Sequence, residues 1–360
     1  MSSQFLWYIP NEVSPGHRGD DVGDDHNSLD TLAGHARALE DSGFSGALIG
    51  TGWGRPDTFT VASALAARTT TFEPLVAIRP GYWRPANFAS AAATLDHLSE
   101  GRLRINIVSG KDHLEAYGDT DGVQADRYER TREFIELTRK LWTEEDVTYR
   151  GKHFTVEDST VVPRIRRRGG RLHPTIYFGG ASASAEKVAA QQADVQLFWG
   201  EPLDDIAERI DRLRDLENAE GRELPPLEFG LRVTTVVRDT SAEAWRDAQA
   251  RVEEMAQQQT RTDATRRVGY NPHRKNAVGQ QRLYDLAARG DVLDDNLYTA
   301  PGRVGGGGAG STWIVGSAEE VAKTLQRYED LGITHFVLSD TPYRDEIRRQ
   351  GRQLLPLLRR

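Results

Sequence analysis

Two groups of polar side chains in the first half of the chain could bind one anionic ligand. Residues 109–112, Ser-Gly-Lys-Asp, follow 103–108, an apolar run typical of a strand with both faces buried. Arg127 and Tyr128 then open a predicted helix, for which Asp126 is the expected N-cap. Helix N-termini and arginine forks suit a phosphate, and ligands bind at the carboxyl ends of parallel strands. The alternative is a strand-to-helix turn without a ligand.

The elements that must position these side chains alternate between strand and helix along the chain. Apolar, β-prone runs predict strands at 5–10, 44–49, 72–79, 103–108, 175–179, 194–199, 227–237 and 334–338. Helical periodicity predicts helices at 29–42, 58–67, 86–98, 128–142, 182–193, 203–219, 241–258 and 342–358. Eight such units fit a TIM (β/α)8 barrel of the α/β class better than an open sheet. We therefore expect residues 1–360 to form a single domain.

One long segment, about 259–310, does not fit the repeating pattern. It is polar, rich in Arg and Asn, and ends in GRVGGGGAG. An irregular insertion before the last strand is typical of an active-site lid or of disorder. The glycines at 305–308 could serve as a phosphate cradle, a hinge or slack, and no GK[ST] follows to favour the cradle.

The composition excludes several classes of function. The net charge of −8 argues against nucleic acid or an anionic membrane as a partner. The absence of cysteine excludes thiol catalysis and disulfides, and nine scattered histidines without metal-ligand spacing predict no metal site. No apolar run is long enough to span a bilayer and the first ten residues do not form a signal peptide, so we expect a cytoplasmic enzyme.

Several segments, taken in order, resemble one family. They read FLWYIP, ATLDHLSEGRLRINIVSG, DRYER, YFGGASASAEKVAAQQAD, FWGEP and FVLSDTPY. Together they resemble the bacterial luciferase-like flavin monooxygenases, with the closest match to the FMNH2-dependent alkanesulfonate monooxygenases. The resemblance covers nearly the whole chain and thins in the insertion. It implies a TIM barrel with a lid-like insertion before the last strand, and a site for FMN.

The resemblance assigns roles around the flavin. Asn106 and Ser109 match positions that contact the isoalloxazine ring, and Arg127 and Tyr128 match the pair that contacts the phosphate and ribityl chain. The other implied cofactor residues are Thr51 and Gly52 beside the ring, Gly180 and Ser182 at the phosphate, and, more weakly, Glu115.

The substrate half departs from the sulfonate group. Three histidines of that group are replaced here, by Glu12, Thr234 and Tyr343. Its cysteine aligns with Arg55. Its lid arginine aligns with Gly306, and one of its tyrosines aligns with Thr341. Trp199 and Arg232 are retained. The resemblance thus gives Arg232, Tyr343 and Glu12 as candidate catalytic residues, and Trp199, Arg55, Thr234 and Thr341 as candidate substrate-binding residues. A zwitterionic or carboxylate substrate would suit Arg55 and Arg232 opposite Glu12, unless Glu12 and Arg55 are solvated loop residues.

The function implied is that of a two-component monooxygenase. A separate NAD(P)H:flavin reductase would supply FMNH2, and O2 would be the co-substrate for oxygenation of a small organic molecule. Relatives form homodimers or homotetramers, and we expect the same here. The alternatives are an F420-dependent hydride-transfer oxidoreductase of the same superfamily, or a catalytically silent flavin-binding protein.

Overall fold

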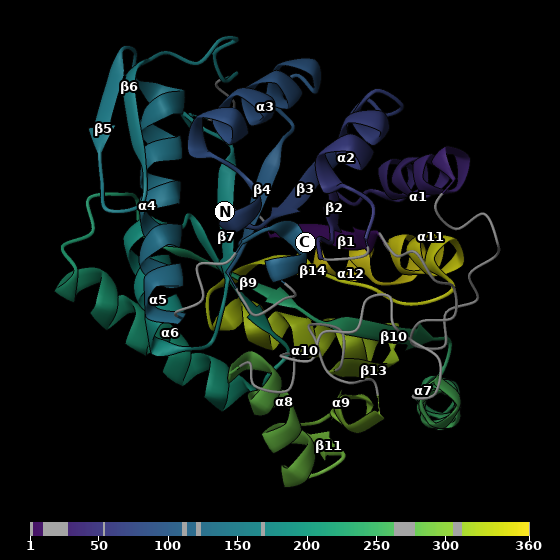
Figure 1. The fold of residues 1–360 in the computed structure, drawn as a ribbon. Helices are drawn as coiled ribbons and strands as arrows, with labels where there is room; N and C mark the ends of the chain where they lie inside the picture. Colours follow the sequence, from purple (N-terminus) through teal and green to yellow (C-terminus); the bar gives the residue numbers. More distant parts are fainter. Residues whose placement is uncertain are drawn as a thin grey trace.

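The computed structural model describes residues 3–9, 28–52, 55–109, 114–119, 124–166, 170–262, 278–304 and 312–359. Eight parallel strands close into a barrel, in which each strand pairs with the next along the chain and the last pairs with the first (Figure 1). The strands are β1 (Gln4–Ile9), β2 (Gly46–Ile49), β3 (Glu73–Ile78), β4 (Arg104–Val108), β7 (Thr175–Gly179), β8 (Val195–Trp199), β9 (Glu228–Arg232) and β14 (Ile333–Val337). The predicted TIM barrel is confirmed.

Helices surround the barrel and bury their apolar faces against it. They are α1 (Leu29–Ser42), α2 (Thr58–Ala66), α3 (Pro85–Leu98), α4 (Gln124–Thr143), α5 (Ala183–Gln192), α6 (Leu203–Ala219), α10 (Ala318–Asp330), α11 (Tyr343–Gln353) and the short α12 (Leu355–Leu358). In α1, Leu32, Ala36 and Leu39 are buried at helical spacing. Ser28 accepts a hydrogen bond from the backbone N–H of Thr31, and Gly43 ends the helix at φ 84°.

Two layers of side chains fill the barrel interior. An apolar layer of leucines and valines occupies the middle and includes Leu6, Leu75 and Leu197. A polar chain lies at the amino-terminal end: Arg104 donates to Tyr177 Oη at 2.7 Å, and Tyr177 Oη lies 2.8 Å from His335 Nδ1. His335 Nε2 in turn lies 2.7 Å from Glu228 Oε2. The inside of the barrel is therefore a packed core over the part of the chain that the structure describes, and a ligand would bind at its carboxyl end.

A second, four-stranded sheet lies beside the barrel. Its strands run in the order β10 (Thr234–Arg238), β13 (Trp313–Ser317), β12 (Leu297–Tyr298) and β11 (Val292–Leu293). Helices α7 (Ser241–Thr262), α8 (Val278–Arg289) and α9 (Pro301–Val304) accompany it. Much of the 259–310 insertion is therefore built from short elements, which corrects the expectation of an irregular segment; its glycines at 305–308 lie outside the described residues.

Two local predictions were wrong, and one segment carried no prediction. The predicted strand 227–237 is two strands, because Val233 separates the barrel strand β9 from β10 of the side sheet. The segment that contains β13 and α10 was not predicted, although Ser317 and Glu320 form a capping box. Asp126 is not an N-cap, because α4 already begins at Gln124; its Oδ1 instead accepts a hydrogen bond from Lys152 Nζ at 2.7 Å.

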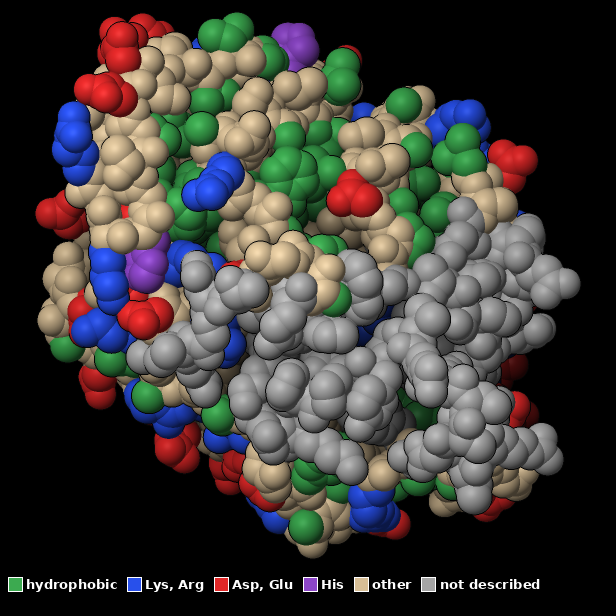
Figure 2. All heavy atoms as spheres, viewed as in Figure 1, with side chains coloured by type: hydrophobic (Ala, Val, Ile, Leu, Met, Phe, Trp, Pro, Cys, Tyr) green, Lys and Arg blue, Asp and Glu red, His purple; other side chains and the backbone are tan. Residues whose placement is uncertain are grey.

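The remaining elements lie at the surface. Strands β5 (Val147–Arg150) and β6 (Thr155–Ser159) form an antiparallel hairpin, and the short helices η1 (Pro80–Tyr82) and η2 (Leu114–Tyr117) lie in loops. On the side of α4 to α6 in Figure 2, basic and acidic side chains are interspersed, as expected of solvent-exposed helix faces. Over the described ranges, no helix has the length and apolar character needed to cross a membrane.

Candidate active site

A cavity of about 260 Å³ opens at the carboxyl ends of the barrel strands. Its walls come from the ends of β2, β3, β4, β7, β8 and β9, from the first turn of α4, from the start of α5 and from α6. The first residues of α8, which belongs to the insertion, complete the lining. Ligand sites of TIM barrels are built at this end, from loops that follow several different strands.

Eight residues predicted from the sequence line this one cavity. They are Thr51, Asn106, Arg127, Tyr128, Gly180, Ser182, Trp199 and Arg232. The chain separates them by up to about half its length, and only closure of the barrel brings them together.

Three predicted residues lie near the cavity but do not line it. The buried Ser109 hydroxyl is 2.7 Å from Thr131 Oγ1, which itself donates to the carbonyl oxygen of Arg127, so Ser109 ties the end of β4 to α4. The Gly52 carbonyl accepts a hydrogen bond from Tyr117 Oη at 2.7 Å. Arg55 donates to Tyr8 Oη at 3.1 Å.

Three other predicted residues, Thr234, Thr341 and Tyr343, are not part of the cavity lining. Thr234 Oγ1 lies 3.0 Å from Ser339 Oγ, and Thr341 Oγ1 accepts a hydrogen bond from Arg251 at 3.4 Å. Tyr343 packs edge-on against the His35 ring, with 5.8 Å between centroids. Glu12, Gly306 and the side chain of Glu115 lie outside the described residues.

The middle of the cavity wall contains a buried amide. Asn106 is 7% exposed, and its Oδ1 has no hydrogen-bond partner among the described residues. A buried polar atom without a partner costs free energy, so a ligand that supplies an N–H group at this point would be stabilised.

One end of the cavity is suited to an anion. The Ser182 hydroxyl caps α5 by accepting the N–H of Ala185 at 3.2 Å, and the start of that helix faces the cavity. A Cβ on Gly180 would lie 2.4 Å from the Cβ of Ala185, so only glycine lets the chain pass this close to the helix. Backbone N–H groups at a helix N-terminus favour phosphate.

Arg127 adds positive charge to the cavity. Its Nε is buried and has no hydrogen-bond partner within the described part of the chain. Burial lowers the pKa of Arg127, the neighbouring Tyr128 opposes this, and the charges of Arg79 and Arg130 lower the pKa further. Since Arg130 is held by Asp119 through two hydrogen bonds of 2.8 and 2.6 Å, an anion in the cavity would relieve mainly the repulsion at Arg127.

Two guanidinium groups contact Tyr8 of β1, and one of them, that of Arg232, lines the cavity. Arg232 is 2% exposed, donates to the carbonyl oxygens of Val233 and Val337 at 3.0 and 3.4 Å, and lies 5.1 Å from the centroid of the Tyr8 ring. Arg55, which does not line the cavity, donates to the Tyr8 hydroxyl. Tyr8 was not predicted from the sequence, although its alternation with Leu6 on β1 indicates an inward-facing side chain.

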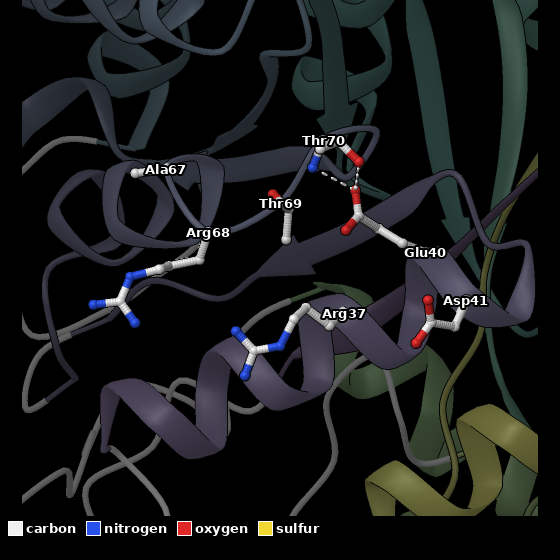
Figure 3. A pocket seen from close by; sticks show the side chains of 7 residues that line it. All are labelled: Arg37, Glu40, Asp41, Ala67, Arg68, Thr69 and Thr70. Atoms are coloured by element: carbon white, nitrogen blue, oxygen red, sulfur yellow. Dashed lines mark hydrogen bonds between the residues drawn. The ribbon is translucent and has the colours of Figure 1, made fainter.

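A second, more open hollow of about 500 Å³ lies between α1 and α2 (Figure 3). Glu40 Oε1 accepts the backbone N–H groups of Thr70 and Phe72, each at 2.8 Å. Burial alone would raise the pKa of Glu40, but these N–H groups outweigh burial and lower it. The Glu40 carboxylate thus holds the turn between α2 and β3 in place, at the amino-terminal end of the barrel. This structural role accounts for the carboxylate without a ligand.

The comparisons with known proteins agree with this architecture. A riboflavin lyase, solved with modified FMN and riboflavin, is 20% identical with a TM-score of 0.77, over 100% of this chain and 92% of that one. EDTA monooxygenase from Chelativorans sp. BNC1 is 17% identical with a TM-score of 0.76, over 99% and 93%. An F420-dependent secondary alcohol dehydrogenase is 16% identical with a TM-score of 0.70, over the whole of both chains. At these identities the similarity shows the fold alone.

The sequence comparison goes further than the fold. The model of the family described as luciferase-like monooxygenase matches residues 3–335, which include seven of the eight barrel strands, the first half of β14 and the whole cavity lining. The chain therefore belongs to the luciferase-like monooxygenase family.

Proposed function

We propose that the chain is a monooxygenase that uses FMNH2 and O2. The observation that carries the proposal is that one cavity combines an anion-binding end with a buried, unpartnered amide. FMN has the matching groups, because its phosphate is a dianion and its ring carries N–H donors and carbonyl acceptors. The residues thus fit the cofactor by chemistry and not only by resemblance.

Each lining residue has a role in holding the cofactor. Arg127 and the N-terminus of α5 at Ser182 would bind the phosphate, with Gly180 leaving room for it. Asn106 would hydrogen-bond the ring, and Thr51 and Tyr128 would contact the flavin. When bound, reduced FMN supplies two electrons for the reaction with O2, in which one oxygen atom enters the substrate and the other leaves as water.

Arg232 and Trp199 form the part of the cavity left for the substrate. The Arg232 guanidinium is buried and fixed by two carbonyl oxygens, so it would donate hydrogen bonds to negative charge that develops on the transferred oxygen. Trp199 and the start of α8 would exclude water from the site. Tyr343, Thr234 and Thr341 have contacts elsewhere, so we assign them no direct step.

The two guanidinium groups that contact Tyr8 indicate the chemical class of the substrate. An organic molecule with a carboxylate or a similar anionic group suits Arg232 and Arg55. An alkanesulfonate is one member of this class, but most side chains expected for a sulfonate are replaced here. A separate flavin reductase as electron supplier and a homo-oligomeric state are further parts of the proposal.

An F420-dependent hydride transfer is the second candidate. It is favoured by the similarity to the F420-dependent alcohol dehydrogenase, which covers the whole chain. Both cofactors carry a phosphate and a tricyclic ring, so the anion-binding end of the cavity alone does not separate them.

A binding experiment separates the two. The purified chain would be titrated with oxidised FMN, and anaerobically with FMNH2 and with reduced F420, with calorimetry as the readout. We expect FMNH2 to bind most tightly. If only F420 binds, the chain would be assigned to the hydride-transfer enzymes. If no cofactor binds, both candidate functions would be contradicted.

A further inference from the structure

A buried ion cluster joins the insertion to the phosphate end of the cavity. Arg209 of α6 is 2% exposed and donates to Glu201 at 2.7 Å and to Glu186 at 3.0 Å. Its remaining nitrogen donates to the carbonyl oxygen of Gly180 at 2.8 Å. Arg282 of α8 donates to both carboxylate oxygens of Glu201, to Oε1 at 3.2 Å and to Oε2. We call the chain of contacts from Arg282 through Glu201 and Arg209 to the Gly180 carbonyl the Glu201 bridge.

Glu201 is the central member of the bridge. It is 2% exposed, and it lines the cavity together with Arg209. Its backbone carbonyl accepts a hydrogen bond from Tyr328 of α10 at 2.6 Å, so three helices hold this one residue. The Arg209 guanidinium also lies over the Phe198 ring, with 4.6 Å to the centroid.

Arg282 and Arg209 share the carboxylate of Glu201. A buried carboxylate needs charged partners. Without Arg282, Glu201 would depend on Arg209 alone, while Glu186 also draws on Arg209 and on Arg212. The Arg209 guanidinium would then turn toward Glu201, and its bond to the Gly180 carbonyl would weaken.

The Gly180 carbonyl matters because of what lies beside it. It accepts hydrogen bonds from Arg209 and from Gln196 Nε2, the latter at 3.0 Å. A carbonyl oxygen repels an anion, and two donors on that oxygen reduce the repulsion. The same donors fix the loop that leads into the capped N-terminus of α5.

The insertion contacts the cavity at a second point. A Cβ on Gly279 would lie 3.0 Å from Cζ3 of Trp199, so the first turn of α8 lies against the indole ring. One docked position of α8 therefore sets both the Trp199 side of the cavity and, through Arg282, its phosphate end.

We propose that Arg282, Glu201 and Arg209 are positioning residues that couple the docking of α8 to cofactor affinity. The inference rests on the proposed function, since it takes the cavity as the FMN site. Coupling is reciprocal: if docked α8 tightens FMN binding, then bound FMN must stabilise docked α8 by the same factor.

The test compares two arginines of the same helix. Arg282→Met breaks the bridge, whereas Arg289→Met breaks the exposed ion pair of α8 with Asp205, which lies at 2.7 Å. We expect Arg282→Met to weaken FMN binding about 5- to 10-fold and Arg289→Met to change it by less than about 2-fold. Arg282→Lys, which keeps a donor for Glu201, should restore most of the affinity. Circular dichroism would verify that each variant is folded.

Hydrogen exchange supplies the second readout. FMN should slow amide exchange in α8 of the wild type and of Arg289→Met, but not in Arg282→Met. Wild-type affinity of Arg282→Met, or equal losses in both arginine variants, would overturn the inference while leaving the proposed function intact. Failure of the wild type to bind FMN in either its oxidised or its reduced form would instead refute the proposed function.

Discussion

Asn106 and Arg127 each have a buried polar atom without a partner among the described residues, and both line one cavity. Native proteins pair most such atoms, so these two mark the positions where a ligand completes the structure. Asn106 lies on a strand and Arg127 on a helix, which fixes both independently of the ligand.

Arg127 gives a test of the phosphate end of the cavity. Arg127→Met should weaken FMN binding about 10- to 100-fold, because a charge-assisted hydrogen bond to the phosphate is lost. Riboflavin, which lacks the phosphate, should bind to the variant and the wild type alike. Calorimetric titration of both ligands measures the difference.

Arg132→Met is the matched control, because Arg132 lies five residues further along α4 and pairs with Glu129 and Glu136 at 2.9 and 2.6 Å. It should keep the affinity for FMN. An equal loss for FMN and riboflavin in Arg127→Met would show that Arg127 supports the site without contacting the phosphate.

The sequence was sufficient to predict those cavity-lining residues that belong to local motifs. Ser182, Gly180 and the Arg127–Tyr128 pair each stand beside a recognisable strand end or helix start, and all of them line the cavity. Tyr8, Glu201 and Arg209 were not predicted as site residues. Their positions depend on partners far away in the chain, such as Arg232 for Tyr8 and Arg282 for Glu201, and no local pattern encodes such contacts.

Among the elements, those with strong periodicity and clear ends were predicted to the residue. Helix α1 has an N-cap serine and a C-terminal glycine, and strand β7 is a short apolar run that ends in glycine. The split between β9 and β10 was missed because both halves are equally β-prone, and only the pairing of β10 with β13 separates them.

Strands β4, β7, β14 and β9 are tied together by the polar chain inside the barrel, which ends at Glu228. Burial alone would raise the pKa of Glu228, but the hydrogen bond from His335 and the charge of Arg171 at 2.5 Å outweigh it and lower the pKa to about 2. A lowered pKa means that Glu228 contributes stability above its unfolded pKa. The contribution is lost as the pH falls toward 2.

Glu228→Gln removes this charge and tests whether the ionised carboxylate stabilises the polar chain inside the barrel. The variant should be less stable than the wild type by about 1–3 kcal/mol near pH 7, and the difference should shrink between about pH 5 and pH 2. Urea unfolding at several pH values measures it. Glu157→Gln, at the exposed pair with Arg150, should leave stability unchanged. A difference between Glu228→Gln and wild type that does not vary with pH would contradict this account.

For the molecule as a whole, chain order and barrel order coincide, and for this reason the fold class was predictable. Each strand pairs with the next one along the chain, so a simple alternation of strands and helices specifies the closed barrel. The insertion was less predictable. Its helix α8 is held to the barrel by Arg282 and Gly279, contacts that appear only in the assembled molecule.

The most direct test of the central claim is a crystal structure of the chain with bound FMN. We predict the phosphate within hydrogen-bond distance of Arg127 and the N-terminus of α5, and the flavin ring beside Asn106. A flavin bound elsewhere, or one whose phosphate lies away from Arg127 and Ser182, would contradict the account.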